Sequence, residues 1–162
     1  MSAANGDQER RAVADLEIAS RTEPEASTAH AWLAAGELKA YKLSGDRTAL
    51  ERARVAAVRA VSLDSARPEP HRVLGAVLAS ELDSRGSLHE LEKACRLVPT
   101  DDETWVRWGR TYGRLGEPER EREVYRQVIA ARPHCWQPHW WLAAFVVPRR
   151  TPLTKRSTLT SR

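Results

Sequence analysis

Equivalent residues recur at a spacing of about 34 residues in the second half of this chain, and this spacing restricts the fold more than any other feature. Pro133 stands one such period after Pro99. Gly109 likewise stands one period after Gly75. A fixed period of this length is typical of an array in which one small structural unit is repeated. Such a unit cannot bury its apolar face alone, so stacked neighbours share one continuous core.

Within one period the apolar residues follow helical spacing. Trp105, Trp108 and Tyr112 lie three and four residues apart, as on one face of a helix. Gly116 is suited to end that helix, and Pro118 to open the next one. Each period therefore predicts a pair of antiparallel helices. We expect an all-α protein, a right-handed α-solenoid of about three and a half helix pairs.

The stretch from Trp105 to Pro133 resembles the tetratricopeptide repeat (TPR). That pattern places Trp, Leu-Gly, Tyr, a further aromatic residue, Ala and Pro at fixed positions within each period. Gly109 and Tyr112 occupy their positions, whereas Trp108 replaces the leucine. The glycine of the pattern is expected where the two helices touch, because a missing side chain lets the backbones approach. The resemblance implies a concave groove lined by the first helix of each pair.

A narrower resemblance involves residues between the helices. Tyr41-Lys-Leu-Ser-Gly-Asp46, together with the segment 132–142, is similar to TPR regions attached to bacterial serine/threonine protein kinases and related signalling proteins. No kinase loop or catalytic motif accompanies these residues. What the resemblance implies is a partner-recruiting arm of a bacterial signalling protein, without kinase activity.

The register divides the chain into six expected segments. They are residues 1–26, the second helix of an incomplete repeat; 27–67, an elongated TPR-like repeat; 68–101 and 102–135, two TPRs; 136–147, an orphan first helix; and 148–162, a basic disordered tail. The elongated repeat exceeds the period by about two helical turns, so its faces are nearly preserved. The pattern changes abruptly after Phe145, as expected of a segment of a longer array that is truncated or read out of frame.

Helix starts are predicted from residues whose side chains accept hydrogen bonds from free backbone N–H groups. The expected caps are Ser27 or Thr28, then Asp46, then Ser87. Residues 100–103, Thr-Asp-Asp-Glu, have the composition of a capping box before the third full repeat.

Composition favours a soluble helical protein, since 30% of the 162 residues are charged and 41% are apolar. The net charge of +4 comes from the tail, which holds five basic residues and no acidic one. Without them, 26 basic residues become 21, against 22 acidic ones. The nearly neutral body makes the charge weak support for nucleic-acid binding.

Nothing in the chain predicts export or membrane insertion. The first residues lack the apolar core of a signal peptide. The longest apolar run, residues 140–147, is too short to cross a bilayer. Cys95 and Cys135 are not in a CxxC spacing, which favours a reducing compartment. We expect a cytoplasmic protein.

A basic stripe is the predicted binding site. Opposite the packing face of the third repeat lie Arg107, Arg110 and Arg114, and the equivalent stripes of the neighbouring units add Arg72 and Trp140. Arginine holds carboxylates through two parallel hydrogen bonds, and a tryptophan face can hold an apolar residue. The expected partner is a protein or peptide segment, acidic and with an apolar anchor. The Lys and Asn carboxylate clamp known from TPR proteins is not expected, because the matching positions offer Arg, Ala and Val.

Three alternatives stand beside this interpretation. The arginines can be a solvated helix face, paired in part with Glu69 or Glu103. The protein can be a nucleic-acid-binding helical repeat that uses the groove arginines, Trp140 and the basic tail. It can also be a structural homo-oligomer that associates through Trp140 and Trp141.

No catalytic or cofactor chemistry is predicted. The glycine-rich phosphate loops, the HExxH helix and the GxSxG elbow are all missing from the sequence. His134, Cys135 and His139 cluster, but a structural zinc site needs four ligands, usually in two close pairs. We therefore expect neither an enzyme, nor a metal, nor a cofactor.

Overall fold

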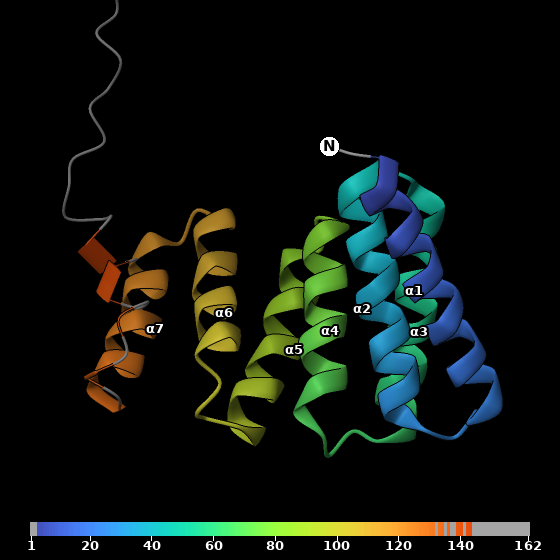
Figure 1. Cartoon of the computed structure of the whole chain (residues 1–162). Coiled ribbons are helices and arrows are strands. Elements are labelled where there is room, and N and C mark those ends of the chain that lie inside the picture. The colour runs from blue at the N-terminus through green and yellow to red at the C-terminus, as the bar shows by residue number, and fades with distance from the viewer. Residues whose placement is uncertain (1–2, 132, 135, 137–138, 141, 144–162) are drawn as a thin grey trace, which may run out of the picture.

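The computed structural model describes residues 3–131, 133–134, 136, 139–140 and 142–143. This part of the chain contains seven helices with defined bounds and no strand (Figure 1). In order, they are α1 (Ala3–Thr22), α2 (Ser27–Ser44), α3 (Arg47–Leu63), α4 (Pro68–Ser80), α5 (Ser84–Leu97), α6 (Asp102–Arg114) and α7 (Pro118–Ala131). None of them is long and apolar enough to cross a membrane. The expected all-α solenoid is confirmed.

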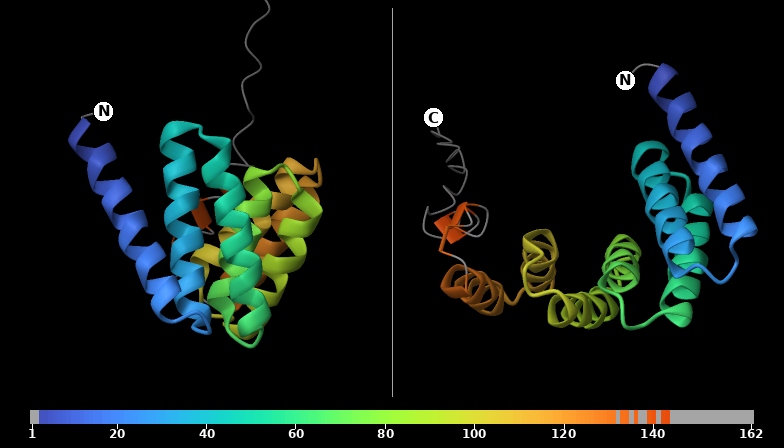
Figure 2. Two further views of the ribbon diagram at one scale, coloured as in Figure 1. Left: turned by 90° about the vertical axis from the view of Figure 1, so that its right-hand side faces the viewer. Right: turned by 60° about the horizontal axis from the view of Figure 1, so that its bottom comes forward.

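The helices pack in sequence order. The closest pairs are α2 with α3, α4 with α5, and α6 with α7, while α1 packs against α2. The right-hand view of Figure 2 shows the helices following an arc, with α4 and α6 on its inner side and α5 and α7 on its outer side. The inner helices thus form one side of the array, as expected for a solenoid with a concave face.

One hydrogen bond recurs at the start of successive repeats and fixes their register. In each case a ring N–H donates to the backbone carbonyl six residues earlier. The bonds are His30 Nε2 to Pro24 (3.0 Å), His71 Nε2 to Ser65 (3.0 Å), Trp105 Nε1 to Pro99 (3.1 Å) and His139 Nε2 to Pro133 (2.9 Å). The intervals from His71 to Trp105 and from Trp105 to His139 are equal, whereas the interval from His30 to His71 is longer. The first full repeat therefore exceeds the others by about two helical turns, and residue 139 stands where Trp105 stands one repeat earlier.

Helix pairs approach closely at the predicted glycines. A Cβ atom added to Gly75 would lie 2.8 Å from Leu91 Cγ, and one added to Gly109 would lie 2.5 Å from Tyr125 Cε1. Both distances are shorter than real Cβ contacts, so only glycine fits. Leu91 and Tyr125 are themselves fully buried. The expected contact between each first helix and its own second helix is confirmed.

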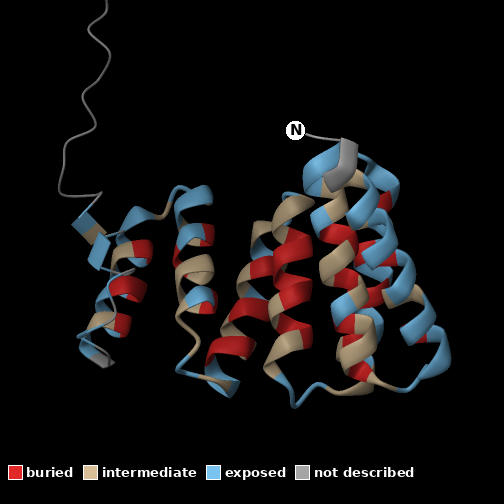
Figure 3. Ribbon diagram, viewed as in Figure 1, coloured by how far each residue is buried: buried red, intermediate tan, exposed pale blue. Residues whose placement is uncertain are grey.

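An apolar cluster lies among α2, α3 and α4, and Figure 3 shows buried turns on these helices. Alanines dominate it on α2 and α3, and Ala34, Ala53 and Ala57 have no exposed surface. Small side chains let these two helices approach closely along most of their length. The larger Leu74 and Val77 of α4 then fill the space beside them.

The helix caps agree only partly with the predictions. Asp46 caps α3 by accepting from the Thr48 N–H at 2.9 Å, as expected. Ser27 does not cap α2, because its hydroxyl donates to the Ala60 carbonyl at 2.9 Å instead. A tertiary hydrogen bond between α2 and α3 has replaced the local one.

The two later cap predictions are wrong. Helix α5 begins at Ser84 and is capped by Asp83, whose side chain accepts from the Gly86 N–H at 2.9 Å. Ser87 lies inside α5 and is fully buried. The capping box does not form, because the Asp101 carboxylate accepts from the Thr104 hydroxyl at 2.5 Å rather than from a backbone N–H.

Candidate functional site

A cleft of about 180 Å³ lies where α2, α4 and α6 meet on the inner side of the array. Its floor is apolar and its rim is basic. The floor consists of Ala35, Leu38, Val73 and Ala76, and the rim of Lys39, Lys42, Arg72 and Arg107. Four cations around an apolar floor make this cleft suited to an anionic group that adjoins an apolar one.

Helix packing builds the floor. Leu38, Val73 and Ala76 are all at least nine-tenths buried, because α2 packs directly against α4. Arg72 precedes Val73 on α4, so its side chain lies at the edge of the buried strip. The Arg72 guanidinium therefore reaches solvent, while the buried Val73 packs α4 against α2.

The length of α2 supplies the lysines. Helix α2 has 18 residues, whereas α4 and α6 have 13 each. By the register of the recurring hydrogen bond, position 39 corresponds to Arg114 at the end of α6. Lys42 lies a further turn along, at a position that the shorter α4 and α6 do not reach. The long first repeat therefore adds a cation that the regular repeats do not have.

Most of the rim cations already have an acidic partner. The ion pairs are Lys39 with Glu9 (2.5 Å), Arg72 with Asp101 (3.8 Å) and Arg107 with Glu103 (2.5 Å). Lys42 is different, since it forms no ion pair with any carboxylate in the described part of the chain. Paired groups hold the rim in place, and Lys42 is left to attract an incoming anion.

The surroundings of Lys42 raise the energy of its charge. Partial burial, then the positive charges of Arg107 and Arg114, lower the pKa of Lys42 from its usual value of 10.5. Glu103 opposes this shift but does not cancel it. A bound anion would relieve the repulsion among these cations, which favours binding of a negatively charged group.

The structure brings together three of the five predicted site residues. Arg72 and Arg107 line the cleft, and Arg114 lies close enough to act on Lys42. Arg110 is exposed on α6, outside the lining, and its charge acts on Tyr125. Trp140 is 58% exposed, follows α7 and also lies outside the lining. Trp141, the second residue of the predicted association face, lies outside the described residues.

Sequence reasoning missed Lys39 and Lys42. Lys39 precedes Arg114 by one elongated and one normal period, an offset that the regular period alone does not reveal. His30 and His71 occupy equivalent positions, because each makes the recurring hydrogen bond described above. The interval between them shows the longer period. Lys42 has no counterpart in the other repeats, so no periodic signal points to it.

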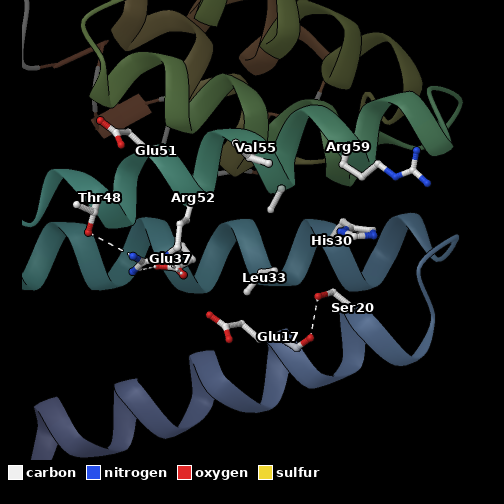
Figure 4. A pocket seen from close by; sticks show the side chains of 11 residues that line it. Glu17, Ser20, His30, Leu33, Glu37, Thr48, Glu51, Arg52, Val55 and Arg59 are labelled. Atoms are coloured by element: carbon white, nitrogen blue, oxygen red, sulfur yellow. Dashed lines mark hydrogen bonds and ion pairs between the residues drawn. The ribbon is translucent and has the colours of Figure 1, made fainter.

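A second, larger cavity of about 480 Å³ lies between α1 and α3, with α2 as its floor (Figure 4). Its arginines are already neutralised. Arg52 donates twice to the buried Glu37, at 2.6 and 3.0 Å. Arg59 pairs with Glu25 at 2.9 Å. This cavity therefore offers an anion less than the inner cleft does.

Other reactive groups are either buried or dispersed. The described residues contain no group of three His, Cys, Asp or Glu side chains that could hold a metal ion. Of the expected cluster, His139 donates to the Pro133 carbonyl, and Cys135 lies outside the described residues. Burial raises the pKa of the Cys95 thiol to about 12, so this residue is not a ready nucleophile.

The arrangement of helices is shared with TPR proteins of known structure. TTC0263, a thermophilic TPR protein of Thermus thermophilus, superposes with a TM-score of 0.78 at 16% identity, over 86% of this chain and 74% of that one. PilF of Pseudomonas aeruginosa gives 0.72 at 16% identity, over 86% and 61% of the two chains. MamA gives 0.67 at 19% identity, over 89% and 82%. The TPR resemblance is thus confirmed at the level of the fold.

Sequence comparison adds nothing to this likeness. No model of a known protein family matches the chain. No curated protein matches it either.

Proposed function

We propose that this chain, which folds as a TPR-type solenoid, is a non-catalytic protein-interaction scaffold whose inner cleft binds an acidic segment of a partner protein. The resemblance to TPR regions of bacterial signalling proteins extends the proposal to a partner-recruiting role in the cytoplasm. The observation that carries it is the rim of Lys39, Lys42, Arg72 and Arg107 around an apolar floor.

The cleft favours a segment in which carboxylates flank an apolar side chain. The apolar side chain would displace water from the floor formed by Leu38 and Val73. The carboxylates would meet Lys42 and the guanidinium groups of Arg107 and Arg114, with two-point hydrogen bonding to the arginines. Because packed helices hold the rim, binding would cost little ordering of the protein.

Binding to labelled peptides tests the proposal. Fluorescence anisotropy would compare acidic peptides carrying one leucine with peptides of the same composition in which lysine replaces the acids. Wild type should bind only the acidic set. The variant Arg107→Glu/Arg114→Glu should lose at least tenfold in affinity, or about 1.4 kcal/mol. Circular dichroism would establish that both proteins are equally helical.

A variant with the same change in net charge distinguishes binding in the cleft from attraction by the overall charge of the protein. Arg85→Glu/Arg96→Glu changes the net charge equally but lies on α5, outside the lining of the cleft. It should bind the acidic peptides as wild type does. Equal losses in both variants would mean that the attraction is diffuse and would contradict the proposal.

The nucleic-acid alternative predicts a different result. Single-stranded DNA would then bind regardless of sequence, with affinity falling steeply as salt rises. Strong binding of DNA with no preference among peptides would favour that function. Should the acidic peptides bind as expected, affinity purification with wild type and the α6 variant would next identify the partner.

A further inference from the structure

Two cations beside the inner cleft have no acidic partner. Lys42, near the end of α2, and Arg114, the last residue of α6, form no ion pair within the described residues. All 22 acidic residues of the sequence lie between Asp7 and Glu123, inside that part of the chain. Because the other three cations of the rim are already paired, this end of the cleft holds two positive charges that no carboxylate balances.

Both cations lie near Arg107. Arg107 and Arg114 are seven residues apart on α6, which is about two turns and places them on the same face of the helix. Lys42 lines the cleft together with Arg107, and the charges of Arg107 and Arg114 add to partial burial in lowering the pKa of Lys42. Arg107 donates to Glu103 through Nη2, so its Nη1 group has no protein partner. Three groups that donate hydrogen bonds therefore gather at one end of the cleft.

A phosphoryl group matches this set of cations better than a carboxylate does. A phosphorylated serine, threonine or tyrosine carries a charge of about −1.5 to −2 at pH 7 and three acceptor oxygens. A carboxylate carries one negative charge on two oxygens. One phosphoryl group can therefore balance both unpaired cations and accept from Lys42, Arg107 and Arg114 at once, whereas one carboxylate leaves a positive charge unbalanced.

We propose that the anion held by the cleft is a phosphorylated side chain of the partner segment, placed between Lys42, Arg107 and Arg114. This inference rests on the proposed function, in which the cleft binds an acidic segment, and it names the acidic group. The apolar floor favours a protein segment over a nucleic acid, since Leu38 and Val73 would cover an adjoining apolar residue. A phosphodiester also carries only one negative charge per phosphate, too few to balance both cations.

Peptides of nearly equal charge test the inference. They share one sequence with a single leucine and differ only at two neighbouring positions, which hold phosphoserine and alanine, two aspartates, or serine and alanine. Fluorescence anisotropy at constant salt should show the phosphopeptide binding wild type at least tenfold more tightly than the aspartate peptide. Equal affinities would mean that only net charge counts, which would overturn this inference and leave the proposed function standing. A wild type that binds none of the three would overturn both.

Removing either unpaired cation should reduce this preference. Lys42→Gln and Arg114→Gln each leave one positive charge unbalanced instead of two, so each should weaken phosphopeptide binding at least tenfold and aspartate-peptide binding less. Arg85→Gln is the matched control, because Arg85 is exposed on α5, has no ion pair within the described residues and lies outside the cleft lining. It should bind all three peptides as wild type does. Equal losses in the control and in the two cleft variants would overturn the inference.

Competition distinguishes a phosphorylated segment from other sources of phosphate. Inorganic phosphate lacks the apolar neighbour, and single-stranded DNA carries diesters, so at equal phosphate concentration each should displace little of the bound phosphopeptide. Displacement by DNA at that concentration would mean that one charge per phosphate suffices, and it would overturn the inference. If inorganic phosphate displaced the probe as effectively as the unlabelled phosphopeptide does, the segment would contribute nothing to binding, and the inference would fail equally.

Discussion

At the scale of single residues, two buried carboxylates are satisfied by near neighbours. Glu37 of α2 is 1% exposed and accepts two hydrogen bonds from the Arg52 guanidinium on α3. Glu121 of α7 accepts from the Tyr125 hydroxyl at 2.9 Å. Removing either partner would leave a buried group without its hydrogen bond, which is why such pairs are kept together.

His71 and Glu90 form another enclosed pair. His71 Nδ1 lies 2.6 Å from the Glu90 carboxylate, and Nε2–H donates to the Ser65 carbonyl. Burial disfavours the charge of Glu90, but hydrogen bonds from His71 and Lys93 outweigh it and hold the pKa of Glu90 below its usual 4.5. The pair links α4 to α5 and also closes the junction before α4.

The lowered pKa of Glu90 predicts acid sensitivity. A carboxylate whose pKa is lower in the folded state stabilises the fold above the unfolded pKa, and this stability is lost as pH falls through the folded value. Urea denaturation between neutral pH and pH 3 should therefore show wild type losing stability below about pH 4.5. Glu90→Gln should cost about 1–3 kcal/mol at neutral pH and have a shallower acid slope. Parallel slopes would contradict the assignment.

Leu82 is held in a conformation that normally requires glycine. Its φ is 67°, and the N–H of Asp83 donates to the Leu78 carbonyl at 2.9 Å. Gly116 ends α6 in the same way one period later, with φ 75°. The side chain of Leu82 is 87% exposed and compensates little of the strain.

Leu82→Gly should therefore stabilise the protein by about 1 kcal/mol, because glycine adopts this φ without steric cost. Thermal denaturation followed by circular dichroism would measure the gain. Leu82→Ala keeps the Cβ atom and should gain much less. A glycine variant less stable than wild type would show that the leucine side chain makes a stabilising contact.

At the scale of elements, the additional turns of α2 determine the chemistry of the inner face. They place Lys42 beside Arg107 and Arg114 of α6, two repeats along the chain. The regular repeats end their first helices too early to contribute there. The elongated helix α2 thus adds Lys42 to the arginines of the inner face.

The pH dependence of binding should report on Lys42. Because its pKa is lowered, Lys42 loses its charge at a lower pH than an ordinary lysine. Affinity for acidic peptides should fall as pH rises from neutrality toward 10.5. Lys42→Arg should remove most of this fall, since arginine stays charged throughout. Identical profiles for the two proteins would exclude Lys42 from the site.

The close approach of α6 and α7 predicts a clear contrast between two glycines. In Gly109→Ala the new methyl group would overlap Tyr125, which should cost about 1–3 kcal/mol. Gly6 also lies in a helix, α1, but a methyl group there would meet only the end of the Arg10 side chain, at 4.0 Å. Gly6→Ala should therefore be neutral or stabilise by up to about 1 kcal/mol. Urea denaturation of both variants would measure the difference, and equal effects would contradict the packing.

At the scale of the whole molecule, stability is unevenly distributed. The main apolar cluster joins α2, α3 and α4, each of which packs on two or more neighbours. Val13 is the one apolar side chain of α1 that is buried among its described residues, whereas α3 buries six and α4 five, and Figure 3 shows α1 as mostly exposed. In an array stabilised by contacts between neighbours, the ends open first.

Hydrogen exchange should follow that gradient. Backbone amides of α3 and α4 should exchange most slowly, and those of α1 most rapidly among the described helices. Mass spectrometry of exchanged peptides at low protein concentration would measure the order. Uniform protection along the chain would instead mean that the array unfolds as one cooperative unit.

The sequence predicted the parts of this structure that repeat. The regular period indicates helix pairs, and Gly75 and Gly109 mark the places where the helices touch. Local propensity was less reliable at helix starts, because Ser27 and Asp101 found tertiary or side-chain partners that local reasoning does not consider. Of the predicted basic stripe, Arg72 and Arg107 line the inner cleft and Arg114 lies near Lys42, and their role in binding stays a prediction.

The order of residues was thus enough to establish the fold class and the register, because apolar spacing and glycine positions are local properties that each repeat restates. Which charges meet depended on how the helices pack. Lys42 joins Arg107 because α2 packs beside α4 and extends past its end, and a non-repeating length of helix leaves no periodic signal.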